Sequence, residues 1–193
     1  MYIRRKSKKI LALLLTITMI VTSVVMLQQS TAYAQTKEVT AYVTISDQGN
    51  IAQSEGRFMV NVPVKVASKT GAATVDQIMK AFHKTYKPGG YVFDGYVKKL
   101  WNVETDNTLF FINNLSCTSG ADSEMVKSGD YLTASVNSDN QYYSDYYTFF
   151  DSSKKTAVSG SEFTVSLKGY LGMTQNAKAE SIKNVNVGLV TKD

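Results

Sequence analysis

The feature that most restricts how this chain can fold is a strict alternation of apolar and polar residues in two segments around residues 40 and 60. The apolar positions are Val39, Ala41, Val43 and Ile45 in the first segment and Phe58, Val60, Val62, Val64 and Val66 in the second. A repeat of two residues predicts strands that bury one face and leave the other polar. Because Pro63 has no N–H to donate, we expect the second strand to lie at a sheet edge or to turn the Pro63 nitrogen outward.

A single helix is predicted next. Thr74 is a good N-cap, and Gln77 three residues later completes a capping box. An apolar stripe at helical spacing follows, made of Val75, Ile78, Met79, Phe82 and Tyr86. The run Pro88-Gly89-Gly90 ends the helix. The only histidine, His83, is placed on this helix but off the stripe.

Short strands are predicted again after the helix, separated by Asn, Asp, Ser and Gly. They cover residues 91–93, 109–112, 131–136 and 146–150. Strands, one helix and more strands predict an α+β fold, mostly β, in which one helix covers one face of a mixed sheet. We place this unit at residues 35–151.

The residue pattern changes from residue 152 onward. A polar connector at 152–155 leads to an alternating strand at 163–167 and another at 185–190. Two strands are too few to bury the core of an independent sandwich. We interpret residues 152–193 as an incomplete immunoglobulin-like β segment from a chain cut short; the alternative is that these strands complete the first domain.

The N-terminus has the three parts of a secretory signal peptide. Five basic residues within positions 4–9 precede an apolar stretch at 10–27, and the small residues of Ala32-Tyr33-Ala34 form a cleavage site. We predict a signal peptide at 1–34 with cleavage before Gln35, and a secreted or surface-associated product without a stable membrane span. An uncleaved anchor is the alternative, because 18 mostly apolar residues reach the lower limit for a span.

Removal of the signal peptide changes the charge balance. Five of the 21 basic residues lie in it, so 16 remain beside the 16 acidic residues, and the predicted mature chain is neutral. This balance argues against nucleic-acid binding. Cys117 has no second cysteine with which to form a disulfide, so the hydrophobic core must hold the fold, a habit that fits a Gram-positive exported protein.

No arrangement of residues predicts catalysis, a metal site or a cofactor. One histidine and one cysteine cannot build a zinc cluster, and no serine lies in a Gly-x-Ser-x-Gly elbow. The acids that border Gly, Asn or Ser are interpreted as turn residues: Asp94, Glu104, Asp106, Asp130 and Asp145. A hydrolase that uses an unrecognised carboxylate pair among them is kept as an alternative.

Aromatic residues are concentrated at 141–150, where six of ten residues are Tyr or Phe. A strand buries only alternate residues, so Tyr142, Tyr143 and Tyr147 are candidates for exposed rings that stack on a sugar or planar ligand. Trp101 is a further candidate. The alternative for all four is that their rings fill the core.

Several blocks resemble exported surface proteins of Firmicutes that carry a domain of unknown function similar to the C-terminal domain of transcobalamin. They include residues 43–49, 60–64, 74–76, 100–114, 129–132 and 143–150, and the most specific are Leu100-Trp101 and Tyr143-Ser144-Asp145. Residues 160–169 resemble the start of the immunoglobulin-like unit in longer relatives. The resemblance implies a β-grasp-like sheet and no catalytic residues.

Together these observations predict a non-enzymatic, exported binding or adhesion module. Its expected partner is a surface protein, a glycan or a small ligand. The transcobalamin resemblance adds a corrinoid-type small-molecule binder as an alternative.

Overall fold

The computed structural model describes residues 36–138, 145–152, 156–171 and 179–185. The predicted signal peptide, Tyr142 and Tyr143 lie outside these residues. Within them the fold is α+β and mostly β, with one helix, as the sequence predicts.

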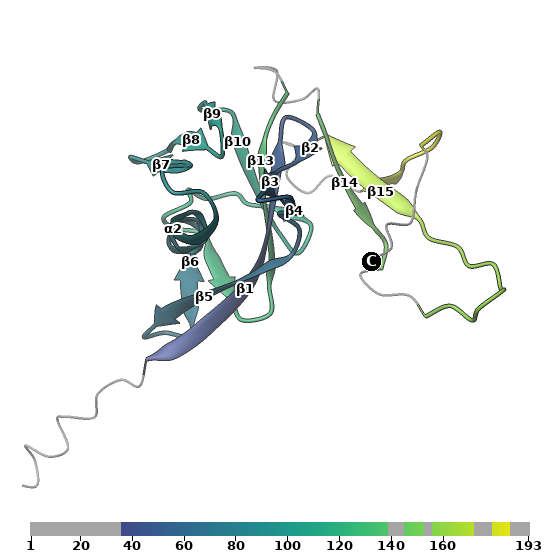
Figure 1. The fold of residues 1–193 in the computed structure, drawn as a ribbon, viewed down its shortest axis with the longest axis horizontal. Helices are drawn as coiled ribbons and strands as arrows, with labels where there is room; N and C mark the ends of the chain where they lie inside the picture. The colour runs from purple at the N-terminus through teal and green to yellow at the C-terminus, as the bar shows by residue number, and fades with distance from the viewer. Residues whose placement is uncertain (1–35, 139–144, 153–155, 172–178, 186–193) are drawn as a thin grey trace, which may run out of the picture. The chain divides into compact units, whose positions relative to one another are not determined.

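A six-stranded mixed sheet forms the centre of the fold (Figure 1). On one side of its longest strand, β1 (Lys37–Asp47), follow the parallel strand β13 (Tyr131–Val136) and then the antiparallel strands β10 (Thr108–Ile112) and β11 (Leu115–Ser116). On the other side, β1 pairs antiparallel with β5 (Val62–Ser68) and with the short β2 (Asn50–Ile51). Among the described strands β5 pairs only with β1, so it is the edge strand that Pro63 predicts.

The second alternating segment is shorter than predicted. Phe58 and Val60 are exposed, whereas Met59 between them is fully buried. Asn61 adopts a left-handed backbone conformation with φ 49°, which breaks the strand and resets the alternation. Only from Val62 onward do the predicted apolar positions face the core.

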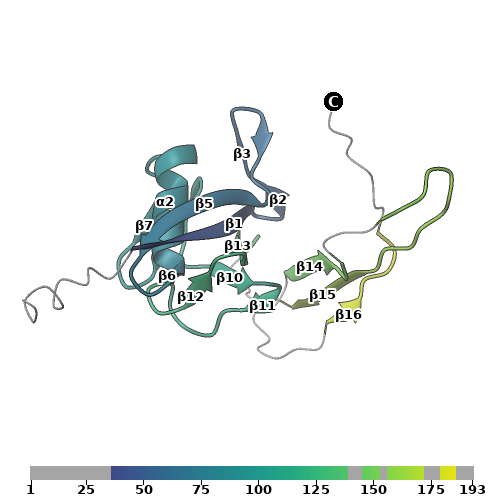
Figure 2. The same cartoon turned by 90° about the horizontal axis from the view of Figure 1, so that it is seen from below.

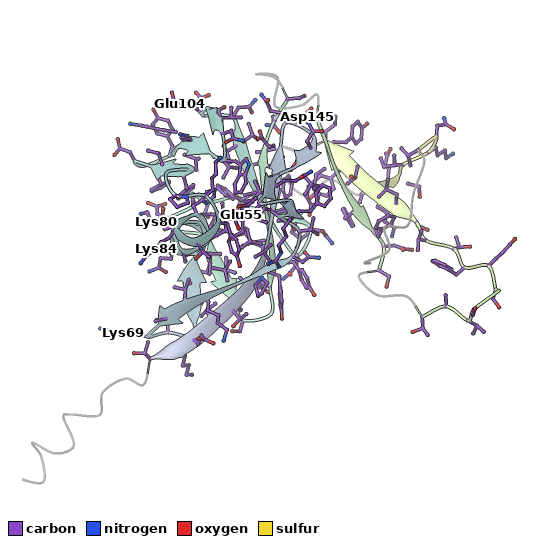
Figure 3. All side chains as sticks on the ribbon, in the orientation of Figure 1. Glu55, Lys69, Lys80, Lys84, Glu104 and Asp145 are labelled. Atoms are coloured by element: carbon purple, nitrogen blue, oxygen red, sulfur yellow. The ribbon has the colours of Figure 1, made fainter. Side chains whose placement is uncertain are left out.

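Helix α2 (Val75–Tyr86) lies across one face of the sheet (Figure 1). Its predicted capping box is present: the Gln77 N–H donates to Thr74 Oγ1 at 3.2 Å, and the Thr74 N–H donates to Gln77 Oε1 at 2.9 Å. Such a cap stabilises a helix by about 1 kcal/mol. Figure 3 shows Lys80 and Lys84 on the outer side of α2, so the charged side chains face water.

The core lies between α2 and the sheet. Fully buried side chains from both layers include Val39, Val43, Ile45, Leu132, Ile78, Met79 and Phe82. The alternation predicted for the first strand is therefore confirmed, because every second residue of β1 faces the helix.

Four small sheets complete the described structure. Two are hairpin-sized, β3 (Gln53–Ser54) with β4 (Arg57–Phe58) and β6 (Ala72–Thr74) with β12 (Met125–Lys127). The third is a meander of β7 (Tyr91–Phe93), β8 (Val97–Leu100) and β9 (Val103–Glu104), and the fourth contains β14 (Tyr146–Phe150), β15 (Leu167–Leu171) and β16 (Glu180–Ser181) (Figure 2).

The strand predicted at 163–167 is misplaced. The structure begins β15 at Leu167, where antiparallel pairing with Phe150 of β14 starts. Phe163 precedes it and is exposed. Residues 146–150 thus pair with residues 167–171 across the predicted boundary at 151, and residues 186–190 of the strand predicted at 185–190 fall outside the described residues. In the part of the chain that is described, no helix is long and apolar enough to cross a membrane.

Candidate functional site

The sheet face opposite α2 carries hydroxyl groups beside apolar side chains. Because β1, β13 and β10 are paired in register, their outward residues form rows across the sheet. One row contains Ile51, Ser46, Ser135 and Leu109, and the next contains Thr44, Thr133 and Phe111. Each row therefore places two hydroxyls side by side next to an apolar residue.

These rows form the floor of a hollow with a volume of about 240 Å³. Its other walls come from the end of β13 and the start of β14, and we call it the sheet-face hollow. The lining residues are Thr44, Ser46, Gly49, Ile51, Leu109, Phe111, Thr133, Ser135, Asn137, Asp145, Tyr146, Tyr147 and Thr148. Its lining joins residues far apart in the sequence, which is typical of a binding site positioned by a rigid scaffold.

Two polar side chains at one end of the hollow are held in fixed positions. Asn137 is only 4% exposed, and its Nδ2 donates to Asn107 Oδ1 at 2.6 Å. The Asp145 carboxylate accepts hydrogen bonds from the backbone N–H and the hydroxyl of Ser138, both at 2.6 Å. Figure 3 shows Asp145 where β14 begins. Groups fixed in this way bind with less loss of side-chain entropy.

The floor offers hydroxyls without partners. Thr44 Oγ1 accepts the Asn61 N–H at 3.0 Å, and Thr133 Oγ1 lies 3.4 Å from the Tyr147 hydroxyl. Within the described residues, by contrast, no hydrogen bond is made by the hydroxyls of Ser46 and Ser135, which are neighbours in register. A hydroxyl can both donate and accept, so this pair can form hydrogen bonds with donors or acceptors of a ligand.

Tyr147 forms one wall of the hollow and is not a freely exposed ring. Its ring stacks on Phe111 with the centroids 3.8 Å apart, and its hydroxyl donates to Asn114 Oδ1 at 2.9 Å. Burial raises the pKa of Tyr147. The predicted stacking role therefore does not fit this residue, and its alternative as a packing residue does. Its neighbour Tyr146 is 58% exposed, but its side chain points to the opposite face of β14, because successive residues of a strand alternate.

Trp101 is buried in the core and lies on the helix side of the sheet. It is 2% exposed and contacts Phe82 and His83 of α2, so its ring offers no platform to a ligand. Its backbone has φ 58° at the turn between β8 and β9, a conformation that bulky residues rarely adopt. The contacts of the ring, including Lys87 Nζ at 5.6 Å from its centroid, hold it there.

His83 is also buried, although the sequence placed it off the apolar stripe. It is 3% exposed and stacks on Tyr91 with 5.5 Å between ring centroids. Burial lowers the pKa of His83 to about 4. The hydrogen bond between Nδ1 and the Met79 carbonyl, at 2.9 Å, raises the pKa but by less. The stripe is wider than predicted because the β7–β9 meander covers this flank of the helix. His83 is thus a neutral core residue.

The remaining reactive groups have structural partners. Burial raises the pKa of Cys117 to about 12, so its thiol is not activated. The Asp94 carboxylate pairs with Lys98 at 2.7 Å, which lowers its pKa. The Asp130 carboxylate accepts hydrogen bonds from Asn113 Nδ2 and the Lys127 N–H. Within the described residues no three metal-ligating side chains gather into a cluster.

Sequence analysis missed the floor of the hollow. Ser46, Thr133 and Ser135 were passed over because each looks like an ordinary polar position of an alternating strand. The available signal was the repetition of hydroxyl residues on the outward face of two strands, at 44 and 46 and again at 133 and 135. Only the pairing of β1 with β13 brings the two sets together.

Comparisons with known proteins give no match to the chain among family models, curated proteins or solved structures. What the hollow binds must be inferred from its own chemistry.

Proposed function

We propose that this protein is a non-enzymatic, exported binding module, secreted or held at the cell surface, which recognises a small polar ligand in the sheet-face hollow. The single observation that carries the proposal is the hollow itself. It combines unpartnered hydroxyls, fixed polar groups and apolar walls, the usual mixture in a ligand site. Export is supported by the basic, apolar and Ala-x-Ala segments of the N-terminus.

The proposed fold is β-grasp-like. The order β5, β1, β13, β10, with β1 and β13 parallel and the helix following β5 and the short β6, supports this interpretation. In such a sheet the helix occupies one face. The other face is then the natural place for recognition, because its outward residues are not needed for the core.

A small ligand fits this hollow better than a corrinoid. Pockets for drug-sized ligands have volumes of about 300–1,000 Å³. The sheet-face hollow, at about 240 Å³, is smaller than this range. The hollow also lacks a nucleophile paired with a base among its described lining residues, which favours binding over catalysis.

The test begins with export of the full chain from a Gram-positive host. We expect the protein in the culture medium to begin at Gln35 on N-terminal sequencing. The product, labelled with ¹⁵N, is then titrated with a library of small polar fragments. Binding should shift the amide resonances of Ser46, Leu109 and Ser135.

A filled variant provides the control. Ser135→Leu places an apolar side chain in the hollow and should abolish these shifts. Thr40→Leu makes the same kind of change on β1 outside the hollow and should leave them intact. Fragments that bind both variants equally, or a product retained with its leader inside the cell, would contradict the proposal.

A further inference from the structure

The charge of the hollow restricts its ligand. Among the described residues that line it, Asp145 is the only charged one, and none is Lys, Arg or His. An anionic ligand would meet a carboxylate without a compensating cation, at a cost in free energy. The Asp145 carboxylate already accepts two hydrogen bonds from Ser138. These features favour a neutral ligand.

The hydrogen-bonding groups further restrict the ligand. Ser46 and Ser135 present adjacent hydroxyls without partners among the described residues, and Thr148 also belongs to the lining. Hydroxyls that donate and accept are matched by a ligand with several neighbouring hydroxyls of its own. Asn137, fixed by its bond to Asn107, adds an amide at the end of the floor.

The apolar groups are placed for a ring with a non-polar face. Ile51 and Leu109 lie at the two ends of the row that contains Ser46 and Ser135. A pyranose ring has hydroxyls around its edge and C–H groups on its faces. Ile51 and Leu109 can contact such a face, while the hydroxyls of the sugar meet the two serines between them.

We propose that the sheet-face hollow binds a single neutral pyranose unit of a glycan, with Ser46 and Ser135 bonding to its hydroxyls and Ile51 and Leu109 packing against its C–H face. This assignment rests on the proposed function, because it names the ligand class of the same hollow.

The experiment titrates the exported protein with methyl glycosides of glucose, galactose and N-acetylglucosamine, followed by ¹⁵N NMR. At least one should bind with a dissociation constant in the millimolar range and shift the amides of Ser46 and Ser135. Glucuronate should bind about tenfold more weakly, as expected when a negative charge is added near Asp145 at a cost of about 1.4 kcal/mol.

Variants test the named contacts. The double variant Ser46→Ala, Ser135→Ala should weaken glycoside binding about tenfold or more, because it removes two hydrogen bonds. Thr40→Ala, on β1 outside the hollow, should leave binding unchanged. Leu109→Ala should weaken binding because it removes an apolar contact, whereas Leu109→Met should retain it because an apolar side chain of similar size is kept.

The outcomes separate the two proposals. If fragments of another class shift the hollow and the glycosides do not, the pyranose assignment is overturned and the binding function stands. If neither fragments nor glycosides shift the hollow, both are overturned. Glycoside binding that survives the double serine variant also overturns the assignment.

Discussion

The same strands form both faces of the central sheet, but one face is packed into the core and the other lines a hollow. On the helix side, Val43 and Ile45 of β1 are fully buried against α2. On the other side, Thr44 and Ser46 of the same strand line a hollow. The comparison shows that a period of two lets one strand supply the stability of the fold and a polar surface at once.

The faces also differ in how they are covered. The helix side is closed by α2 and contains large apolar side chains. On the hollow side, Tyr147 and Tyr170 cover Phe111. Stability should therefore depend mainly on the first face.

The largest difference is expected between two adjacent residues of β1. Ile45→Ala should lower the free energy of unfolding by about 2–5 kcal/mol, because it leaves a cavity under α2. Thr44→Ala should cost about 1 kcal/mol, since it removes the hydroxyl that accepts the Asn61 N–H. Urea unfolding of both variants measures the ratio, and equal losses would contradict the assignment of the two faces.

The next largest effect is a loss of stability at acid pH, caused by His83. The pKa of His83 is about 4 in the folded protein against 6.5 ordinarily, so the unfolded chain takes up the proton first as pH falls. The contribution of His83 to the free energy of unfolding is fully present above pH 6.5. It falls by about 3 kcal/mol in total as the pH drops from 6.5 to 4.

Urea unfolding at several pH values measures this loss, with His83→Gln as the control. The Nδ1 of His83 faces the Met79 carbonyl, its ring faces Tyr91 and Trp101, and the Lys87 ammonium lies over Trp101. The raised pKa of Asp47 has the opposite effect, so the difference between the wild type and the variant is the quantity to compare. The same slope in both would show that His83 does not titrate in this way.

A smaller loss is expected on the hollow side. Tyr147→Phe removes the hydrogen bond to Asn114 but keeps the ring on Phe111, and should cost about 1 kcal/mol. Hydrogen exchange should accelerate in β14 and β15 while β1 stays protected. Faster exchange in β1 to the same extent would indicate that the two sheets unfold as one unit.

The last prediction concerns the reactivity of Cys117 and involves no change in stability. Its pKa of about 12 predicts that iodoacetamide alkylates it about a thousandfold more slowly at pH 8 in the native protein than in urea. The thiol packs beside the helix-side core. Mass spectrometry measures the two rates, and comparable rates would place the thiol in solvent.

Sequence patterns predicted elements more reliably than their roles. The strands 131–136 and 146–150 and the cap of α2 at Thr74 were found because alternation and capping are local signals. The second strand was predicted too long because the left-handed backbone at Asn61 leaves no mark in the hydrophobic pattern. The burial of Trp101 and His83 depends on the meander that packs over α2, a contact between separate segments.

The sequence by itself determined the class of fold, the position of the helix and which residues of β1 could enter a core, since each depends on neighbours within a few positions. Only the tertiary structure decided that Ser46 lies beside Ser135 and that Tyr146, not Tyr147, is the exposed ring. The physical reason is that pairing between distant strands is set by the balance of the whole sheet, and no local spacing records it.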